Sequence, residues 1–353
     1  MVGEFTTPEV RECMALTSAY MTAEETSRLL RKSSLFHPSA KAVYSVLQET
    51  GGLTEDHQET IQQSVLQQSN LPAQTKVLVA SMDGVNVLMR EPGVKKGRPT
   101  QRPGEPYKAP VSSYKNAMAG SFSFYTHQLD EKGRLRPDRL ASQYIARMPE
   151  EKFPTFKAMF RRQLDSLESR LPQGTTKILL NDGGLGIWGF LEDERFQEYE
   201  KLIDFYHVSE PLSLAAEALF GKSSPEAQKW YNKWRQHLQE SDHAPRRVIA
   251  SIEYYRKKKK LSAARMEQLL TQITFFERNQ TYMTDATFLK NGWPIGSGPV
   301  EAACKTVVKT RMARSGMRWK RNSGQHVLNL RAYALSSQWD EFWKQYLKLK
   351  NAG

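Results

Sequence analysis

Apolar residues recur with a helical period through residues 8–50, with a Ser/His/Pro break between two of the periodic runs. This pattern predicts three short helices. Thr22 is followed three residues later by Glu25, which fits a capping box at a helix start. Two interpretations of this segment remain open: a helix-turn-helix that binds DNA, or a plain helical hairpin that only packs on its neighbour.

The pattern changes to that of strands from about residue 76. Residues 76–89 (KVLVASMDGVNVLM) and 116–128 (NAMAGSFSFYTHQ) are rich in Val, Phe and Tyr and predict β-strands, with a Pro/Gly/basic loop at 91–110 between them. Helical periodicity returns at residues 135–149 and 153–172. Two further short buried strands are predicted within residues 176–190 and 199–212.

Beyond Pro211 the strand pattern vanishes, and consecutive helical patterns run to about residue 290. A glycine-rich loop then leads into two more segments of helical character. The whole pattern predicts an α/β fold (mixed α+β). Its expected parts are an N-terminal helical region at 1–70, a strand-rich region at 71–210, a helical insertion at 211–290 and a C-terminal part at 291–353.

The charge balance of the chain indicates what kind of partner it binds. The chain has 51 Lys and Arg against 38 Asp and Glu, a formal net charge of +13. Such a surplus favours a polyanion such as nucleic acid. No stretch reaches the roughly 20 apolar residues that span a bilayer, and the first residues lack the pattern of a signal peptide. We therefore expect no membrane partner and a cytoplasmic protein, associated with the nucleoid when it binds DNA.

Cysteine is too scarce for a disulfide framework or a Cys-rich zinc site, because only Cys13 and Cys304 are present. One bridge between them stays open from sequence alone, although reduced thiols are the default. Oxygen ligands, which suit Mg²⁺, are then the ones left for a catalytic metal.

Three acidic residues stand in apolar surroundings that would otherwise form a core. Asp83 lies inside an apolar strand, Asp182 follows the strand KILLN, and Glu301 lies just inside a helix opened by GSGP. Each has an ordinary structural explanation: a hairpin turn at Asp83-Gly84, a turn after a strand at Asp182, and a favourable helix-dipole position for Glu301. As a set, they could instead hold two divalent cations for phosphodiester chemistry.

Basic residues cluster after Glu301, with eight Lys or Arg and no acid from Lys305 to Arg331. Lys305 and Lys309 share the predicted helix face of Glu301 and could grip a phosphate backbone, although a solvated basic face is the ordinary explanation. A second run, Arg256 to Lys260, is either a solvated helix end or a DNA contact. The predicted DNA-binding residues are Lys305, Lys309, Arg311, Arg314, Arg318, Trp319, Lys320 and Arg321, with Trp319 able to stack on a base or to lie in the core.

The string GWPIGSGPVEAACKTVVKTRMARSGMRW, together with the later QHVLNLRA, resembles the C-terminal signature of the ISKra family of bacterial insertion-sequence transposases. SMDGVNV and LLNDGGLGIW are similar to the strands that carry the first two acids in that family. The string DFYH resembles the Asp-x-x-His motif of related transposases. The resemblance covers most of residues 76–335.

The resemblance implies a ribonuclease H-like catalytic core that an α-helical insertion interrupts before the last acid. It implies DDE chemistry with two Mg²⁺ (or Mn²⁺) ions, the catalytic acids and metal ligands being Asp83, Asp182 and Glu301. Asp204 and His207 match an accessory pair that positions DNA near the strand end. The partners it implies are double-stranded DNA, at the element's terminal repeats and at the target, and a homodimer or higher oligomer on DNA. Longer members carry a Cys-rich N-terminal segment, whereas this chain starts near its helical region.

Two rival functions share part of this pattern. A catalytically silent remnant would bind DNA without cutting it, and its sequence would be expected to have lost an acid. A metal-dependent nuclease with another role would cut DNA without joining strands. All three acids are retained in this chain, which favours the transposase.

Overall fold

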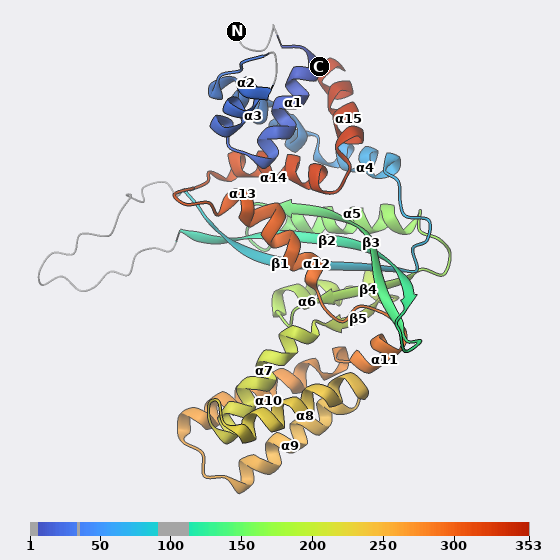
Figure 1. Ribbon diagram of the computed structural model, residues 1–353, viewed down its shortest axis with the longest axis vertical. Helices are drawn as coiled ribbons and strands as arrows, with labels where there is room; N and C mark the ends of the chain where they lie inside the picture. Colours follow the sequence, from blue (N-terminus) through green and yellow to red (C-terminus); the bar gives the residue numbers. More distant parts are fainter. Residues whose placement is uncertain (1–5, 34–35, 91–112, 353) are drawn as a thin grey trace, which may run out of the picture.

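The computed structural model of the chain describes residues 6–33, 36–90 and 113–352. Its centre is a five-stranded mixed sheet with the strand order β3-β2-β1-β4-β5 (Figure 1). The strands β1, β2 and β3 pair antiparallel, while β4 and β5 add to β1 in parallel. The predicted loop at 91–110 lies outside the described residues. The strands are β1 (Val77–Leu88), β2 (Tyr114–Leu129), β3 (Leu135–Arg147), β4 (Thr176–Asn181) and β5 (Glu200–Ile203).

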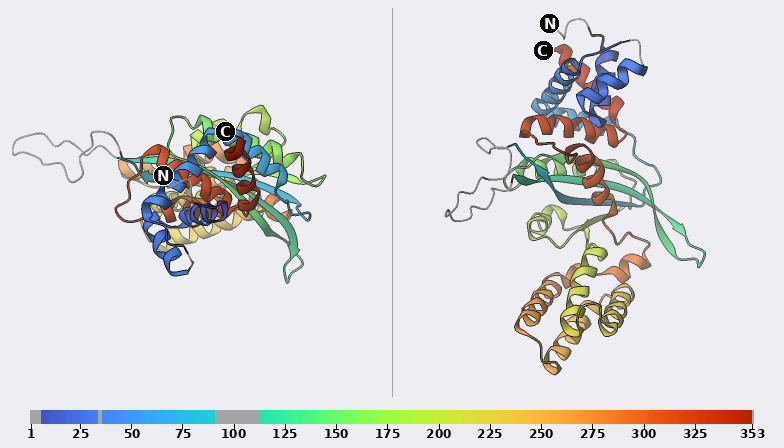
Figure 2. Two further views of the ribbon diagram at one scale, coloured as in Figure 1. Left: turned by 90° about the horizontal axis from the view of Figure 1, so that it is seen from above. Right: turned by 60° about the vertical axis from the view of Figure 1, so that its left-hand side comes forward.

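Helices lie on both sides of this sheet, as the turned view in Figure 2 shows. Before the sheet come α1 (Pro8–Tyr20), α2 (Ala23–Ser33), α3 (Ala40–Asp56) and α4 (Gln58–Gln68). Within and after it come α5 (Pro154–Glu168), α6 (Leu185–Leu191), α7 (Phe205–Phe220), α8 (Pro225–Glu240), α9 (Ala244–Lys258), α10 (Ala263–Asn279), α11 (Asp285–Lys290), α12 (Gly298–Ala303), a π-helix η3 (Cys304–Lys309), α13 (Thr310–Met312), α14 (Arg321–Leu335) and α15 (Trp339–Ala352). Two short 3₁₀ turns are η1 (Glu194–Phe196) and η2 (Gln280–Tyr282).

Alternation along β1 explains why both faces of the sheet are covered. Successive side chains of a strand point to opposite faces. Accordingly, Leu78 and Met82 join the apolar cluster that includes α5 and α6, whereas Val85 and Val87 join the cluster that includes the N-terminal helices and α14. Each face therefore buries its own apolar layer, and the sheet lies between them.

The two ends of the chain pack together on one side of the sheet. In α3, Gly51 lies directly against His326 of α14, and the Asn329 side chain donates to Glu55 (3.1 Å). In α15, the Trp339 indole donates to Glu12 of α1 (3.0 Å). Thus, within the predicted C-terminal part at 291–353, α14 and α15 join the N-terminal helices (Figure 1), while α12 packs against β1 and β2.

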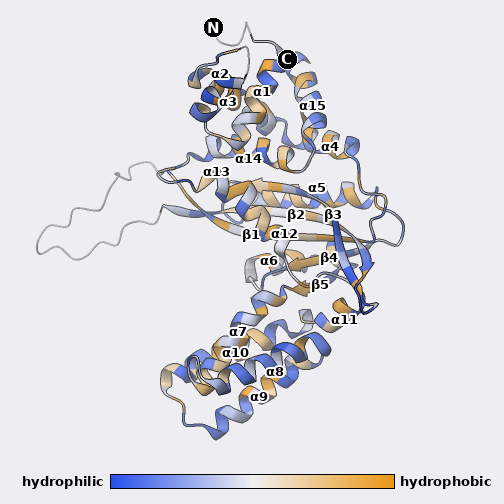
Figure 3. Cartoon of the chain, viewed as in Figure 1, coloured by the Kyte–Doolittle hydropathy of each residue, from blue (hydrophilic) through white to orange (hydrophobic). Residues whose placement is uncertain are grey.

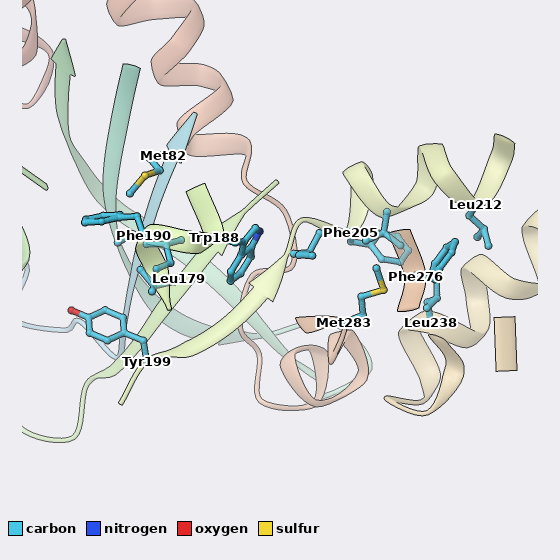
Figure 4. Close-up of a cluster of buried hydrophobic side chains, with 14 of the residues drawn as sticks. Met82, Leu179, Trp188, Phe190, Tyr199, Phe205, Leu212, Leu238, Phe276 and Met283 are labelled. Atoms are coloured by element: carbon cyan, nitrogen blue, oxygen red, sulfur yellow. The ribbon is translucent and has the colours of Figure 1, made fainter. Parts of the chain in front are cut away.

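The helices from α7 to α11 form a body on the opposite side, beyond α6 and β5 (Figure 1). One continuous apolar cluster runs from the sheet into this body, as Figure 4 shows from Met82 and Leu179 through Phe205 to Phe276 and Leu238. The helices α7 to α11 are therefore joined to the sheet through a shared core.

The predicted capping box is present. The Thr22 backbone N–H donates to Glu25 (2.9 Å), and the Glu25 N–H donates to the Thr22 hydroxyl (3.2 Å). The three helices predicted within residues 8–50 are α1, α2 and α3, and the last of them continues to Asp56. Helix α4 lies beyond that segment and was not predicted.

The prediction of a helix at residues 135–149 is wrong, because this segment is strand β3. A tight turn makes it the partner of β2: Gly133 has φ +70°, and the Asp130 carboxylate accepts the N–H groups of Lys132 and Arg134 (both 2.9 Å). Much of β3 is exposed on both faces, so it lacks the alternation of a half-buried strand. Its outer end is hydrophilic in Figure 3.

The two short strands also end earlier than predicted. After Asn181 the chain turns through Gly183 and Gly184 into helix α6, and after Ile203 it enters helix α7. Asp204 stops β5 because its carboxylate caps α7. Pro211, where the insertion was predicted to begin, lies inside α7.

A membrane-crossing element is missing from the described part of the chain, where no helix combines the necessary length with the necessary apolar character.

Candidate active site

The parallel strands β1, β4 and β5 bring three acidic residues to one level. In the β1–β4 pairing, Ala80 lies opposite Leu179, so three residues further on Asp83 is level with Asp182. The Met82 N–H donates to the Asn181 side chain (2.7 Å), which holds this register beyond the regular ladder. In the same way, Asn181 pairs with Ile203, so Asp182 is level with Asp204. Neighbouring strands are about 4.8 Å apart, so these residues are neighbours.

The same three acids are on one face of the sheet. Val77, Val79, Ile178, Leu180 and Leu202 form one apolar cluster. Each acid follows a member of this cluster by an even number of residues along its own strand, and residues at even spacing share a face. On this face, α12 packs against β1 and β2.

Asp83 lies inside β1, which runs through it without a break. The hairpin-turn explanation is therefore wrong, since Gly84 pairs with Met118 of β2. The carboxylate accepts the Gly84 N–H (2.6 Å) and contacts the Cys304 thiol (3.4 Å). Burial raises the pKa of Asp83, and the charge of Asp182 adds to that rise. Asp83 therefore ionises less readily than an exposed aspartate does.

Asp182 begins a turn that two helices fix. Its carboxylate accepts the Gly184 N–H (3.0 Å), and its carbonyl accepts the Trp188 indole N–H (2.5 Å) from α6. The next residue, Gly183, accepts from Arg278 of α10 (2.9 Å). The Asp182 carboxylate is only partly buried, so it is fixed in place and still open to a ligand.

Asp204 is fully buried and has a donor at each of its acceptor positions. One oxygen accepts the backbone N–H groups of Tyr206 (2.6 Å) and His207 (3.2 Å) at the start of α7. The other accepts both the N–H and the hydroxyl of Ser297, in the loop before α12. A carboxylate offers about four lone-pair sites, so this one is saturated.

His207 and Glu301 are both exposed and meet across α7 and α12, with 3.7 Å between Nε2 and Oε1. Among the described residues, Asp204, His207 and Glu301 form the only group of three or more His, Cys, Asp or Glu whose possible ligand atoms all lie within 4.8 Å. The possible ligand atoms of the predicted trio, Asp83, Asp182 and Glu301, do not all lie within that distance of one another. Because Asp204 is saturated, we regard it as the residue that holds the group together, with His207 and Glu301 free to bind.

The segment after Glu301 is wound as a π-helix, a form that often marks functional sites. Its inner side is apolar, with Cys304 and Val307 buried, as is Val300 just before Glu301. Arg331 of α14 donates to the carbonyls of Thr306 and Val307 (2.7 Å to the latter) and to Ala19 (2.5 Å). This buried guanidinium ties the Glu301 segment to the N-terminal helices.

The predicted basic strip divides into an exposed and a buried part. Arg311 is buried, its guanidinium lies 5.2 Å from the centre of the Trp319 ring, and burial lowers its pKa to about 10. Unlike the exposed members, Arg311 therefore presents no open surface for the predicted DNA contact. Trp319 pairs with β1 through its backbone, and its indole donates to Met312 (2.9 Å), which favours the core interpretation. The exposed members are Lys305, Lys309, Arg314, Arg318, Lys320 and Arg321.

Two of these exposed cations already have acidic partners. Arg314 forms an ion pair with Glu25 of α2 (2.5 Å), and Arg321 pairs with Glu150 (3.4 Å). DNA would compete with these partners. Lys305 and Lys309, which follow Glu301, have no acidic partner among the described residues, and they are the strongest remaining candidates for phosphate contacts.

Three residues that organise the site were not predicted. Asn181 aligns β1 with β4, Ser297 binds Asp204, and Arg331 supports the π-helix. A polar residue at the end of an apolar strand and a serine between two glycines were visible signals. Arg331 stood in a quoted motif, but nothing in its spacing showed that it would be buried.

Comparison with known proteins gives only weak structural likeness. No protein-family model matches the sequence, and a search of curated proteins also finds no match. A solved structure, the Drosophila P element transposase strand transfer complex, aligns with this chain at 11% sequence identity and a TM-score of 0.29. The alignment covers 95% of this chain and 80% of the transposase chain. The chain is similar to this transposase at that level only.

Proposed function

We propose that the chain is a DDE transposase of a bacterial insertion sequence, resembling the ISKra family, with a ribonuclease H-like core. One observation carries the proposal. Asp83 and Asp182 lie level on neighbouring parallel strands, on the face where α12 carries Glu301. Three antiparallel strands followed by two parallel ones, with a helical body before the last acid, agree with what that resemblance implies.

The residues fit a hard divalent cation. Asp83, Asp182 and Glu301 supply oxygen donors, and no Lys or Arg among the described residues forms an ion pair with any of them. The raised pKa of Asp83 reflects the free-energy cost of its buried charge, and a bound cation would reduce that cost. We propose that these three residues would hold two Mg²⁺ (or Mn²⁺) ions, which activate the attacking oxygen and stabilise the leaving oxygen of a phosphodiester.

The chain's own groups supply orientation and charge around the reacting phosphate. The Asp182 turn, fixed by Trp188 and Arg278, holds one carboxylate rigid. Asp204 anchors the loop that leads to Glu301, and His207 contacts Glu301. Lys305 and Lys309 would bind the phosphates on either side. In the proposed reaction, water hydrolyses a phosphodiester at the element end and frees a 3′-hydroxyl. This hydroxyl then attacks a target phosphodiester, forms a new bond to its phosphate and releases a target 3′-hydroxyl.

The other regions enter the same proposal with the boundaries expected from sequence. Residues 1–70 would bind DNA if α2 and α3 act as a helix-turn-helix. Residues 71–210 and 291–353 would form the core, and residues 211–290 the insertion. Two DNA ends must be held at once, so we propose a homodimer or higher oligomer on DNA.

Strand transfer tests the proposal directly. Purified protein is incubated with labelled element ends, a target plasmid and Mg²⁺. Joined products are expected. Cleavage without joining would instead indicate a nuclease, and binding without cleavage would indicate a silent remnant. Asp182→Asn should abolish the reaction and leave DNA binding largely intact, whereas Asp340→Asn, on the exposed start of α15, should react like the wild type.

A further inference from the structure

The loop between α9 and α10 carries the strongest local concentration of positive charge on the helical body. Arg256 to Lys260 end α9, and Arg265 lies in the first turns of α10, with no acid between Tyr254 and Met266. We call these six cations the basic tip. Arg256 pairs with Glu253 (2.6 Å), whereas Lys257, Lys258, Lys260 and Arg265 are exposed. Like charges at this density repel one another, so a polyanion would stabilise them.

An aromatic side chain stands beside these cations. Tyr254 is 51% exposed on α9, and Lys258 Nζ lies 4.4 Å from the centre of its ring. In nucleic-acid contacts an exposed aromatic ring can pack on a sugar or an unpaired base while a neighbouring cation meets the phosphate.

A hollow of about 760 Å³ follows α10 away from the basic tip. Met266, Leu270, Thr274 and Phe275 line it, and Arg278 lines its far end. Leu270 is 45% exposed, so the hollow is an open surface feature. Its lining is mostly neutral, apart from Glu267 and Arg278.

The far end of α10 meets the candidate active site. Gly183, the residue after Asp182, lies against Phe275 so closely that an added Cβ would be 2.8 Å from that ring. Arg278 donates to the Gly183 carbonyl (2.9 Å). The hollow therefore begins beside Asp182 and runs to the basic tip. The 17 residues of α10 span roughly 25 Å, at about 1.5 Å per residue.

We infer that the DNA next to the reacting phosphodiester follows α10 and that its backbone contacts the basic tip. This inference rests on the proposed function for the class of nucleic acid. At about 3.4 Å per base pair, roughly 25 Å corresponds to about seven base pairs. The helical body thus acts as a second DNA contact at a fixed distance from Asp182, separate from Lys305 and Lys309.

Flank length gives the contact a distinctive signature. Duplexes that carry the element end are prepared with 4 or 12 base pairs beyond the mapped cleavage position, and their binding is measured at several salt concentrations. For the 12-base-pair flank, the triple variant Lys257→Gln, Lys258→Gln, Lys260→Gln should bind about tenfold more weakly and lower the salt slope by about 2 to 3. For the 4-base-pair flank, it should bind like the wild type.

Lys152, Lys344 and Lys348 provide a matched control, because they are exposed lysines outside the helical body and outside the segments proposed to bind DNA. Their triple change to Gln should alter both flanks equally or not at all. The inference is overturned if the basic-tip variant equals this control on the long flank, or if it loses the same affinity on both flanks. If the true partner of the basic tip is an acidic protein or RNA, the basic-tip variant would equal the control on the long flank.

The cleavage reaction, measured in the same samples, keeps the two hypotheses apart. Wild-type protein that binds DNA with the flank dependence above but never cuts it would contradict the proposed function alone. Protein that cuts and joins DNA without any flank dependence would contradict the basic-tip contact alone.

Discussion

At the scale of single residues, the site combines two carboxylates that repel each other with one that is fully satisfied. Asp83 and Asp182 lie level on adjacent strands without a cation partner among the described residues, whereas Asp204 has four donors. The first two therefore gain from a bound cation and the third does not. Measurements of stability can separate these roles without any DNA.

Asp83→Asn should raise the melting temperature of the protein in EDTA by about 2 °C, because it removes a buried charge close to Asp182. Added Mn²⁺ should stabilise the wild type by about 3 kcal/mol at a hundredfold excess over its dissociation constant, through mass action. The variant should gain little. Thermal unfolding with and without Mn²⁺ measures both effects.

A variant that still gains the full Mn²⁺ stabilisation would show that Asp83 is not a ligand. Asp340→Asn serves as the control, since this exposed carboxylate lies on α15, apart from the proposed metal site. Its Mn²⁺ response should equal that of the wild type.

Asp285 is a buried acid for which the proposed reaction has no use. Both carboxylate oxygens lack a hydrogen-bond partner, and burial, followed by the charges of Asp242 and Asp204, raises its pKa to about 8. A raised folded-state pKa means that its contribution to stability is fully present below the unfolded-state pKa of about 4 and is lost as pH rises through 8.

Asp285→Asn should therefore stabilise the protein, by about 2 to 5 kcal/mol at pH 8 and by much less at pH 4. Urea unfolding across this pH range measures the difference. The exposed Asp138→Asn on β3 should show no such trend. An equal gain at both pH values would mean that Asp285 is not protonated in the folded state.

At the scale of elements, the loop before α12 is held by Asp204 and not by regular structure. Both the backbone N–H and the hydroxyl of Ser297 donate to that carboxylate. The same carboxylate caps α7, so one side chain joins the helix that carries His207 to the one that carries Glu301. The contact between His207 and Glu301 therefore depends on Asp204.

Ser297→Ala removes one donor from a buried carboxylate and should lower the free energy of unfolding by about 1 to 3 kcal/mol. It should also raise the Mn²⁺ concentration needed for half-maximal thermal stabilisation, because Glu301 is less well fixed. Isothermal unfolding and a Mn²⁺ titration test the two effects.

Ser209→Ala on α7 is the matched control, because its hydroxyl donates only to the Phe205 carbonyl of its own helix (2.9 Å). It should change stability slightly and leave the Mn²⁺ titration unaltered. Identical Mn²⁺ titrations for both variants would refute the proposed role of Ser297 and Asp204 in positioning Glu301.

Elements with a strong local signal were predictable from sequence, and those defined by distant partners were not. The strand around Asp83 and the capping box at Thr22 follow from the local sequence pattern alone. The sequence pattern predicts a helix where strand β3 lies, because the identity of β3 depends on pairing with β2 and not on burial. The positions of the candidate site residues along the chain could be guessed, but their register could not.

At the scale of the whole molecule, the N-terminal and C-terminal helices form one packed layer over the sheet. Gly51 packs closely against α14, since an added Cβ would lie 2.3 Å from His326 Cβ and 2.7 Å from His326 Cα. Helix propensity alone would favour Ala at this position by about 1 kcal/mol. Packing between the chain ends opposes it.

Gly51→Ala should therefore destabilise the protein by about 1 to 3 kcal/mol through overpacking. Its neighbour gives the opposite expectation: a Cβ on Gly52 would lie 3.7 Å from the His326 ring, an ordinary contact, so Gly52→Ala should stabilise by about 0.5 to 1 kcal/mol. Chemical denaturation of the two variants measures the signs. Equal signs would mean that α3 and α14 do not pack as described.

Arg331 links the π-helix to Ala19, and it comes 30 residues after Glu301 in the sequence. During synthesis, every acidic group of the candidate site emerges from the ribosome before this arginine does. A product that stops early in α14 would contain the reactive groups without their support. Premature termination of translation would thus leave fragments in which the Glu301 segment lacks the contacts of Arg331.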